Sequence, residues 1–297
     1  MAVGIVTVTY NSAPVLEEFF ESLFAQDHAD FVLYVVDNDS HDATRAMVEA
    51  RQADPRVRAI WSPSNTGIAR GNNLGIAQAL SDGCEHVLLL NNDTVFGPEL
   101  LSGLLNALGR HHADMVVPKM YYHDQPRRIW CAGGRLKPWQ GYTAGHFGYD
   151  EIDHGQRDSA RRIDYSPTCC FLVKRAVFET LGLMDEKFFV YCDDTDFCIR
   201  AKQHGVSLWY VPTPTLLHKV SSLTGSSSEF TLRMLTRGRA YLIRKYAPAW
   251  TLPYHFMMLH AEMVARILVR GEGVKEFGAR ERGFREGLSI PIARRTN

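Results

Sequence analysis

The segment HVLLLNNDT, residues 86–94, sets four apolar residues, Val87 to Leu90, directly before four polar ones. An uninterrupted apolar run of this length predicts a buried strand, so the polar residues lie where that strand ends. A carboxylate placed there, such as Asp93, can hold a hard cation whose other ligands are water and phosphate oxygens. A turn in which Asp93 caps a helix beginning near Pro98 is the competing interpretation.

Around this segment, short β-rich apolar runs alternate with helical patterns. We expect strands at residues 3–9, 31–36, 58–61 and 86–90, and helices at 15–26, 43–53 and 68–80. This alternation predicts βαβ units and an α/β fold with a mainly parallel central sheet flanked by helices. Polar residues gather after the strands, at Asn11, 37–40, 62–66 and 91–94. Because ligands bind outside the carboxyl ends of such strands, these clusters predict a single site.

From Met115 to Tyr149 the alternation gives way to mixed strands and loops rich in glycine and aromatic residues, which we interpret as an inserted binding region. Further along we expect a strand at 165–173, helices at 175–181 and 195–204, a strand at 207–211, and two closing helices at about 229–246 and 253–270. The chain then divides into a domain at 1–228 and a C-terminal helical tail at 229–297. Within the domain we expect two halves, at residues 1–115 and 116–228.

The segment 193–196 places Asp193, Asp194 and Asp196 at the start of a helical pattern. Carboxylates there are stabilised by the helix dipole, so a capping cluster is one interpretation. Like charges packed together also raise at least one pKa, and such a carboxylate can accept a proton from an attacking hydroxyl. His218, which follows a strand, is either a structural histidine or a metal ligand.

Residues 65–75 open a helix just after a strand and contain Gly67, Gly71 and Gly75. We expect these glycines to let the backbone approach a ligand, and the free amides of the helix start to bind a diphosphate together with Arg70. A helix cap by Asn65 or Thr66 is the competing interpretation, and both can hold at once. No glycine-rich dinucleotide motif follows the first strand, and no P-loop occurs in the chain.

Lysine plus arginine equals aspartate plus glutamate at 33 each, so we expect no nucleic-acid partner. No signal peptide or membrane-spanning run is apparent, which predicts a cytoplasmic protein. Six cysteines without a C-x-x-C pair indicate free thiols. The last helix has a wide apolar face followed by basic residues down to Arg295. This pattern fits peripheral contact with the inner face of the plasma membrane, packing on the domain, or a homodimer.

Together these segments resemble glycosyltransferase family 2, which has a GT-A fold, and within it the bacterial rhamnosyltransferase-like branch, over about residues 3–246. The resembling segments are VTVTYN at 6–11, VVDNDS at 35–40, NTG at 65–67, NNLG at 72–75, LLNNDT at 89–94, AGG at 132–134, GLMDE at 182–186, YCDDTD at 191–196 and HKVS at 218–221. Nine such segments in register make the resemblance specific.

The resemblance implies an inverting glycosyltransferase that moves a sugar from a nucleotide-sugar donor to a hydroxyl of a bacterial cell-surface glycan or a lipid-linked saccharide. It implies Asp194 as the catalytic base, a divalent cation (Mg²⁺ or Mn²⁺) held by Asp93 and His218, and Asn91 where the first metal-site aspartate usually stands. Residues 1–115 would be the nucleotide-binding half and 116–228 the acceptor-binding half. The donor residues would be Thr9, Asn11, Asp37, Asn65, Gly67, Arg70, Asn72 and Asn92. The acceptor residues would be Trp130, Gly133, Gly134 and Asp193, the last replacing a frequent glutamate.

The resemblance favours dTDP-L-rhamnose as the donor, with UDP- and GDP-sugars as alternatives. A catalytically silent nucleotide-sugar-binding scaffold of the same fold is a rival of another class, against which the presence of Asp93, Asp194 and His218 argues. A nucleotide-sugar pyrophosphorylase would need a glycine-rich basic loop after the first strand, where Tyr10-Asn11-Ser12-Ala13 stands instead.

Overall fold

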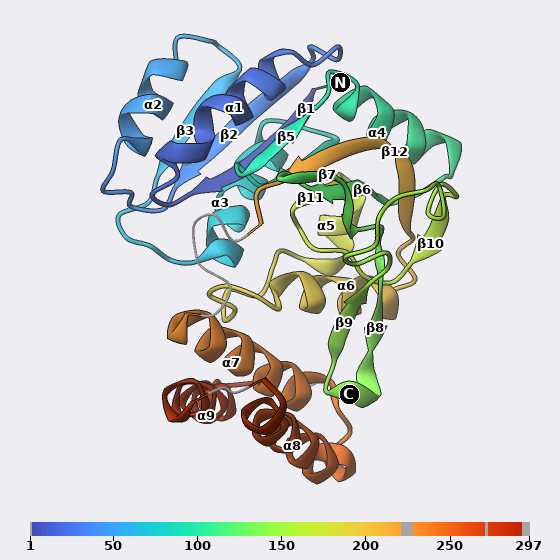
Figure 1. The fold of residues 1–297 in the computed structure, drawn as a ribbon. Helices are drawn as coiled ribbons and strands as arrows, with labels where there is room; N and C mark the ends of the chain where they lie inside the picture. Colours follow the sequence, from blue (N-terminus) through green and yellow to red (C-terminus); the bar gives the residue numbers. More distant parts are fainter. Residues whose placement is uncertain (1, 221–227, 271–272, 293–297) are drawn as a thin grey trace.

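The computed structural model describes residues 2–220, 228–270 and 273–292. Its N-terminal part is a set of parallel strands in the order β3-β2-β1-β4, connected by helices (Figure 1). The elements are β1 (Val3–Thr9), α1 (Ala13–Phe24), β2 (Phe31–Asp37), α2 (Thr44–Arg51), β3 (Val57–Trp61), α3 (Ile68–Ser81) and β4 (His86–Leu90). Strands β1, β2 and β4 are mostly buried because their residues are almost all apolar, whereas the edge strand β3 is partly exposed.

The sheet continues as a mixed sheet in which β11 lies antiparallel between β4 and β6, and β12 runs parallel to β6. The elements here are β5 (Thr94–Phe96), α4 (Leu100–Arg110), β6 (Met115–Tyr122), β7 (Gln125–Cys131), β8 (Gly134–Lys137), η1 (Pro138–Gln140), β9 (Thr143–His146), β10 (Arg161–Ile163), β11 (Cys170–Lys174), α5 (Arg175–Leu181), α6 (Asp193–Gln203) and β12 (Leu208–His218). The predicted α/β fold is confirmed, with the parallel pairs concentrated in its N-terminal half.

Three helices and a short turn complete the described chain: α7 (Glu229–Tyr246), η2 (Ala249–Thr251), α8 (Leu252–Arg270) and α9 (Val274–Ser289). Helix α7 packs closely on α9 through glycines, since a Cβ at Gly283 would lie 2.1 Å from the carbonyl oxygen of Arg233. The β8–β9 hairpin reaches from the sheet to these helices (Figure 1). No described helix is long and apolar enough to cross a membrane.

Most predicted elements are found within about two residues of their expected bounds, but several differ. The strand expected at 165–173 is confined to Cys170–Lys174, whereas the strand expected at 207–211 continues to His218. Two closing helices were expected, and α9 is a third. The sequence of α9 is highly charged and gives no clear apolar face, so the helix was not predicted. Its buried residues are only Ala279, Arg280, Gly283, Phe284 and Gly287. Arg294 and Arg295 of the predicted basic end lie outside the described residues.

Candidate active site

Strand β5 brings Asp93 next to His218. It pairs antiparallel with the end of β12, so that Thr94 lies opposite His218, and the amide of Lys219 donates to the carbonyl of Asp93 at 2.8 Å. The His218 Nε2 and Asp93 Oδ1 atoms are 3.2 Å apart, and both side chains are largely buried. Because a strand intervenes between Asp93 and α4, the alternative in which Asp93 caps that helix is wrong.

The Asp93–His218 pair is chemically suited to a divalent cation. Although the two side chains are close, the Asp93 Oδ1 atom and both His218 ring nitrogens are buried without an aligned hydrogen bond. Buried polar atoms normally have a partner, and carboxylate oxygen and imidazole nitrogen are common metal ligands. In the described part of the chain no three His, Cys, Asp or Glu side chains gather as a metal site, so other ligands would come from water and a phosphorylated donor.

A second carboxylate, Asp194, lies at the start of α6. Its Oδ2 atom accepts a hydrogen bond from the Tyr165 hydroxyl at 2.8 Å, and its Oδ1 atom accepts from the Thr195 amide at 2.5 Å and the Thr195 hydroxyl at 3.1 Å. Burial raises the pKa of Asp194, and the hydrogen bonds from Tyr165 and Thr195 work against that rise. The carboxylate is therefore fixed in direction while its proton affinity is increased.

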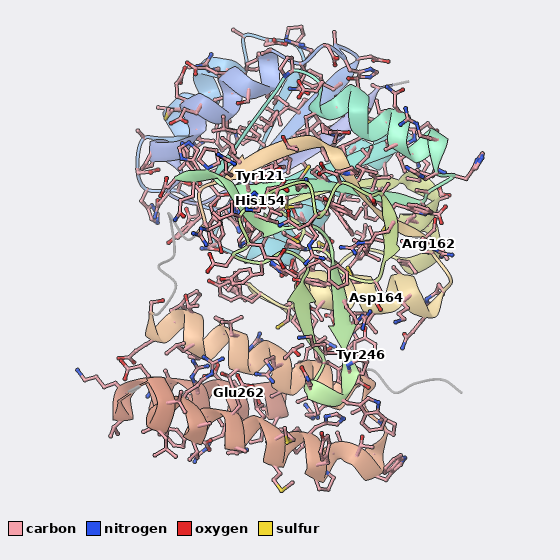
Figure 2. The ribbon with its side chains drawn as sticks, turned by 45° about the vertical axis from the view of Figure 1, so that its right-hand side comes forward. Tyr121, His154, Arg162, Asp164, Tyr246 and Glu262 are labelled. Atoms are coloured by element: carbon pink, nitrogen blue, oxygen red, sulfur yellow. The ribbon has the colours of Figure 1, made fainter. Side chains whose placement is uncertain are left out.

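The three carboxylates of residues 193–196 have different surroundings. Burial, with the nearby charge of Asp194, raises the pKa of Asp193 to about 8, and the Asp193 Oδ2 atom has no hydrogen-bond partner. Asp196 is fully buried and accepts from Lys245 Nζ at 2.5 Å and from the Tyr246 hydroxyl at 2.7 Å, both on α7. Figure 2 shows Tyr246 where α7 meets the rest of the molecule. Asp196 thus anchors α6 to α7, and Asp194 is the carboxylate of the three that can take part in a reaction.

A chain of rings joins Asp194 to the Asp93–His218 pair. The Trp130 ring lies 4.3 Å from the His218 ring and 5.3 Å from the His146 ring, measured between centroids, and His146 stacks on Tyr165 at 5.7 Å. Burial, the largest effect, lowers the pKa of His146, so its imidazole is neutral near pH 7. Sequence reasoning missed His146 and Tyr165 because neither stands in a recognisable motif.

The polar residues that follow β1 and β2 meet around Asp37, and the Asp37 carbonyl accepts from the amide of Ser62, just after β3, at 2.9 Å. The Asp37 Oδ1 atom accepts from the hydroxyls of Thr9 at 2.9 Å and Ser40 at 2.6 Å. Thr9, one of the predicted donor residues, is fully buried, and its side chain supports Asp37. The Asn11 Oδ1 atom accepts from the His41 amide at 2.8 Å, which holds this loop over the strand ends.

The start of α3 differs from the prediction of free amides. The Gly67 amide donates to Asn65 Oδ1 at 3.0 Å, and the Ile68 amide donates to the Phe189 carbonyl at 2.7 Å. A Cβ at Gly67 would lie 2.2 Å from that carbonyl oxygen, so Gly67 admits protein backbone instead of a ligand. Arg70 is half exposed and lies 3.9 Å from Glu186, at the edge of the site.

Several other predicted residues serve packing in the structure. Gly71 and Gly75 let α3 approach Val8 and Val6 of β1, since added Cβ atoms would lie 2.7 and 2.3 Å from these side chains. Asn92 donates to the Val8 carbonyl at 2.7 Å. The remaining predicted positions are placed as follows: Asn72 is buried in α3, Asn91 is half-buried after β4, Gly133 lies against Ile163 and Tyr210, and Gly134 lies against Gly145 and the Tyr165 ring.

Sequence comparison finds sugar-transferring enzymes among the relatives of this chain. The sequence model described as "Glycosyl transferase family 2" matches residues 4–182. The chain is 28% identical over 240 residues to the N-acetylglucosaminyl-diphospho-decaprenol L-rhamnosyltransferase of Mycobacterium tuberculosis, covering 74% of this chain and 77% of that protein. It is 25% identical over 221 residues to the dTDP-rhamnosyl transferase RfbF of Shigella flexneri, covering 72% and 68%.

Solved structures share the fold at lower sequence identity. A mannosyltransferase from Pyrobaculum calidifontis in complex with GDP-Man and Mn²⁺ aligns with a TM-score of 0.59 and 16% identity, covering 97% of this chain and 87% of that chain. GalNAc-T7 with UDP, GalNAc and Mn²⁺ aligns with a TM-score of 0.68 and 13% identity, covering 97% of this chain but 56% of that chain.

Proposed function

This chain belongs to glycosyl transferase family 2, and from that premise we propose that it transfers L-rhamnose from dTDP-L-rhamnose to a hydroxyl of a lipid-linked saccharide or cell-surface glycan. The chain is a glycosyltransferase by family and fold. The names of its relatives from Mycobacterium tuberculosis and Shigella flexneri support the rhamnosyl donor. The first of these names also supports a lipid-linked acceptor, which would place the enzyme at the inner face of a membrane.

The observation that carries the proposal is the half-buried Asp194 carboxylate, joined through Tyr165, His146 and Trp130 to the Asp93–His218 pair. In the proposed reaction the acceptor oxygen attacks the anomeric carbon of the donor as the bond to the diphosphate oxygen breaks, so the configuration inverts. Asp194 accepts the proton that the acceptor hydroxyl loses, and its raised pKa makes it a stronger base than an exposed aspartate.

Asp93 and His218, with Asn91 adjoining, would hold a divalent cation. Bound there, the cation would supply charge that stabilises the departing diphosphate. We assign Asn11 and Asp37, at the strand ends, to the nucleobase. We assign Asn65, which precedes α3, and Arg70 and Asn72, in its first turns, to the donor. Trp130, whose ring contacts those of His218 and His146, and Asp193, which precedes Asp194 in α6, are the residues that we assign to the acceptor.

Donor binding tests the assignment. Thermal-shift and calorimetric titrations with dTDP, UDP and GDP, each with Mg²⁺, Mn²⁺ or EDTA, are expected to show metal-dependent binding and preference for dTDP, because a ligand that binds only the folded state raises its stability. Preference for UDP or GDP would mean that the donor is a UDP- or GDP-sugar and not dTDP-L-rhamnose. The absence of a response to every nucleotide would favour a silent scaffold and overturn the proposal.

Asp194→Asn tests the catalytic assignment, because it keeps the shape of the side chain and removes the proton acceptor. Transfer from dTDP-L-rhamnose to a lipid-linked acceptor should be lost, while the donor Kd stays within a few-fold of the unsubstituted value. A variant with unchanged turnover would remove Asp194 from the mechanism.

A further inference from the structure

The outward face of α8 is apolar along its described length. Its exposed residues recur at the three- and four-residue spacing of a single helix face, and they include Tyr254, Met257, Val264 and Leu268. Leu268 and its neighbour Val269 are 80% and 82% exposed. A 19-residue helix is about 28 Å long, so this is an extended strip and not a scattered set of side chains.

The charged side chains described on α8 are turned away from this strip. Glu262 accepts from Arg239 of α7 at 2.6 Å and from Arg266 at 2.8 Å. Figure 2 shows Glu262 among the helices of this part of the molecule. His255 is buried, and the half-buried His260 contacts the Phe284 ring of α9. The inward face of α8 therefore serves the helical bundle, and the outward face is left to a partner.

The strip continues onto neighbouring elements through aromatic residues. Trp250 of η2 is 79% exposed, and Trp139, at the tip of the β8–β9 hairpin, is 64% exposed. The Tyr254 hydroxyl donates to the Trp139 carbonyl at 3.2 Å, which joins the hairpin tip to α8. We call the surface formed by Trp139, Trp250, Tyr254, Met257, Leu268 and Val269 the apolar tail face. Tryptophan and tyrosine are the residues enriched where proteins meet the membrane interface.

The charges around the apolar tail face favour a lipid surface over a second copy of the chain. Exposed Lys137 adjoins Trp139 near the start of α8, and exposed Lys275 follows its end. If two copies packed α8 on α8, the segments that carry these lysines would be brought together at both ends, in either direction of packing, and like charges near an interface disfavour it. Anionic headgroups would neutralise both ends at once.

We propose that the apolar tail face docks the protein onto an anionic membrane, with α8 lying in the plane of the interface. An extended apolar patch of this kind marks an interaction site, and an amphipathic helix that cannot span a bilayer binds in the interface plane. Helix α8 lies at the end of the molecule away from β1–β3 (Figure 1), so the α/β part would stand clear of the lipid.

Docking in this way would also bring the candidate active site to a position where it could receive a lipid-linked substrate from the membrane. Strand β9 of the hairpin ends at His146, and β8 begins at Gly134 against the Tyr165 ring, while the hairpin tip reaches the apolar tail face. The same hairpin therefore connects the membrane surface with the surroundings of Asp194. This consequence rests on the proposed function, whereas the docking itself does not.

Vesicle co-sedimentation of the full chain tests the docking. We expect binding to vesicles of phosphatidylcholine with phosphatidylglycerol, weaker binding to phosphatidylcholine alone, and partial loss of binding in high salt. Met257→Glu with Leu268→Glu should reduce the bound fraction by at least about tenfold, because two charges would enter the apolar layer. Leu183→Glu, at an exposed apolar residue of the α/β part, is the matched control and should bind normally.

Equal binding by the double variant and the control, or no binding of the unsubstituted chain to any vesicle, would overturn the proposal. The proposal would also be overturned if light scattering showed a dimer of the unsubstituted chain, a monomer of the double variant, and neither protein bound vesicles. The double variant and the unsubstituted chain should have matching circular dichroism melts, since both substituted side chains are exposed. Transfer to a soluble acceptor analogue should survive in the double variant. Vesicle binding without any transfer would refute the proposed function and leave the docking intact.

Discussion

Tyr165→Phe is expected to move the pH dependence of transfer. The Tyr165 hydroxyl donates to Asp194 Oδ2 at 2.8 Å, and a hydrogen bond to the charged carboxylate lowers its pKa. Such a bond contributes about 1.5–3 kcal/mol, and 1.36 kcal/mol corresponds to one pKa unit. Since the proposed base works deprotonated, removing the hydroxyl should shift the acid limb of kcat/KM upward by about 1–2 pH units.

The assay is the initial rate of nucleotide release at low donor concentration across the range from about pH 5.5 to pH 9.5, with constant cation and acceptor. Phenylalanine keeps the ring that stacks on His146, so the donor Kd should change little. Tyr121→Phe is the control, because the Tyr121 hydroxyl donates to Asp153, outside the site. It should leave the acid limb in place.

Other titrating groups lie near Asp194 and also affect the acid limb of kcat/KM. Asp193 has a pKa raised to about 8 and interacts with Asp194, so the limb reports the pair and not one residue. His146, with its pKa lowered, is neutral over most of the range. An unshifted or downward-shifted limb in Tyr165→Phe would refute the assignment of Asp194 as base, whatever the size of the rate loss.

Three further predictions concern the cation, the backbone and the buried acid. Asp93→Asn should weaken donor binding in the presence of Mn²⁺ by at least about tenfold and make it insensitive to EDTA; equal affinities with and without cation in the unsubstituted chain would contradict the metal site. Gly67→Ala should lower the free energy of unfolding by about 1–3 kcal/mol in urea melts. It should cost more than Gly83→Ala, which shares a positive φ but meets no neighbouring atom. Because the folded state holds the Asp193 proton more tightly than its ordinary pKa of 3.8 allows, stability should fall as pH rises from that value towards about 8. Asp193→Asn should therefore raise Tm most at alkaline pH, and a Tm gain confined to acidic pH would contradict the burial of a protonated acid.

The sequence predicted well those features that depend on local signals. The strand at residues 86–90 was expected with the bounds that the structure has, because its apolar run and the polar residues after it are adjacent in the chain. The helix 68–80 was found almost as expected, yet the purpose of its glycines was misread. A local glycine pattern indicates that another group lies close to the backbone, but it does not identify that group. Here the groups are the Val8 side chain and the Phe189 carbonyl, which only the tertiary fold brings there.

The contacts that assemble the candidate site were beyond sequence reasoning for the same reason. Asp93 meets His218 because β5 pairs with β12, two strands far apart in the chain. Tyr165 reaches Asp194 from a loop before β11, and His146 arrives at the end of a hairpin. No spacing rule connects these positions. Only the resemblance brought Asp93, Asp194 and His218 into one hypothesis, and it left their supporting residues unnamed.

The geometry of Asp194 depends on α7 as much as on α6. Tyr191 and Cys192 both have a left-handed φ of 64°, a conformation that costs roughly 1–2 kcal/mol for each residue with a side chain. Gly238 of α7 admits this turn, since a Cβ there would lie 2.9 Å from the Cys192 sulfur. Asp196 is held by two α7 side chains, and α7 also contributes Tyr241 to the main core. The strained turn that aims Asp194 is thus maintained by a helix that the sequence assigned to a separate tail, so the boundary predicted at residue 228 crosses the interactions that position the proposed base.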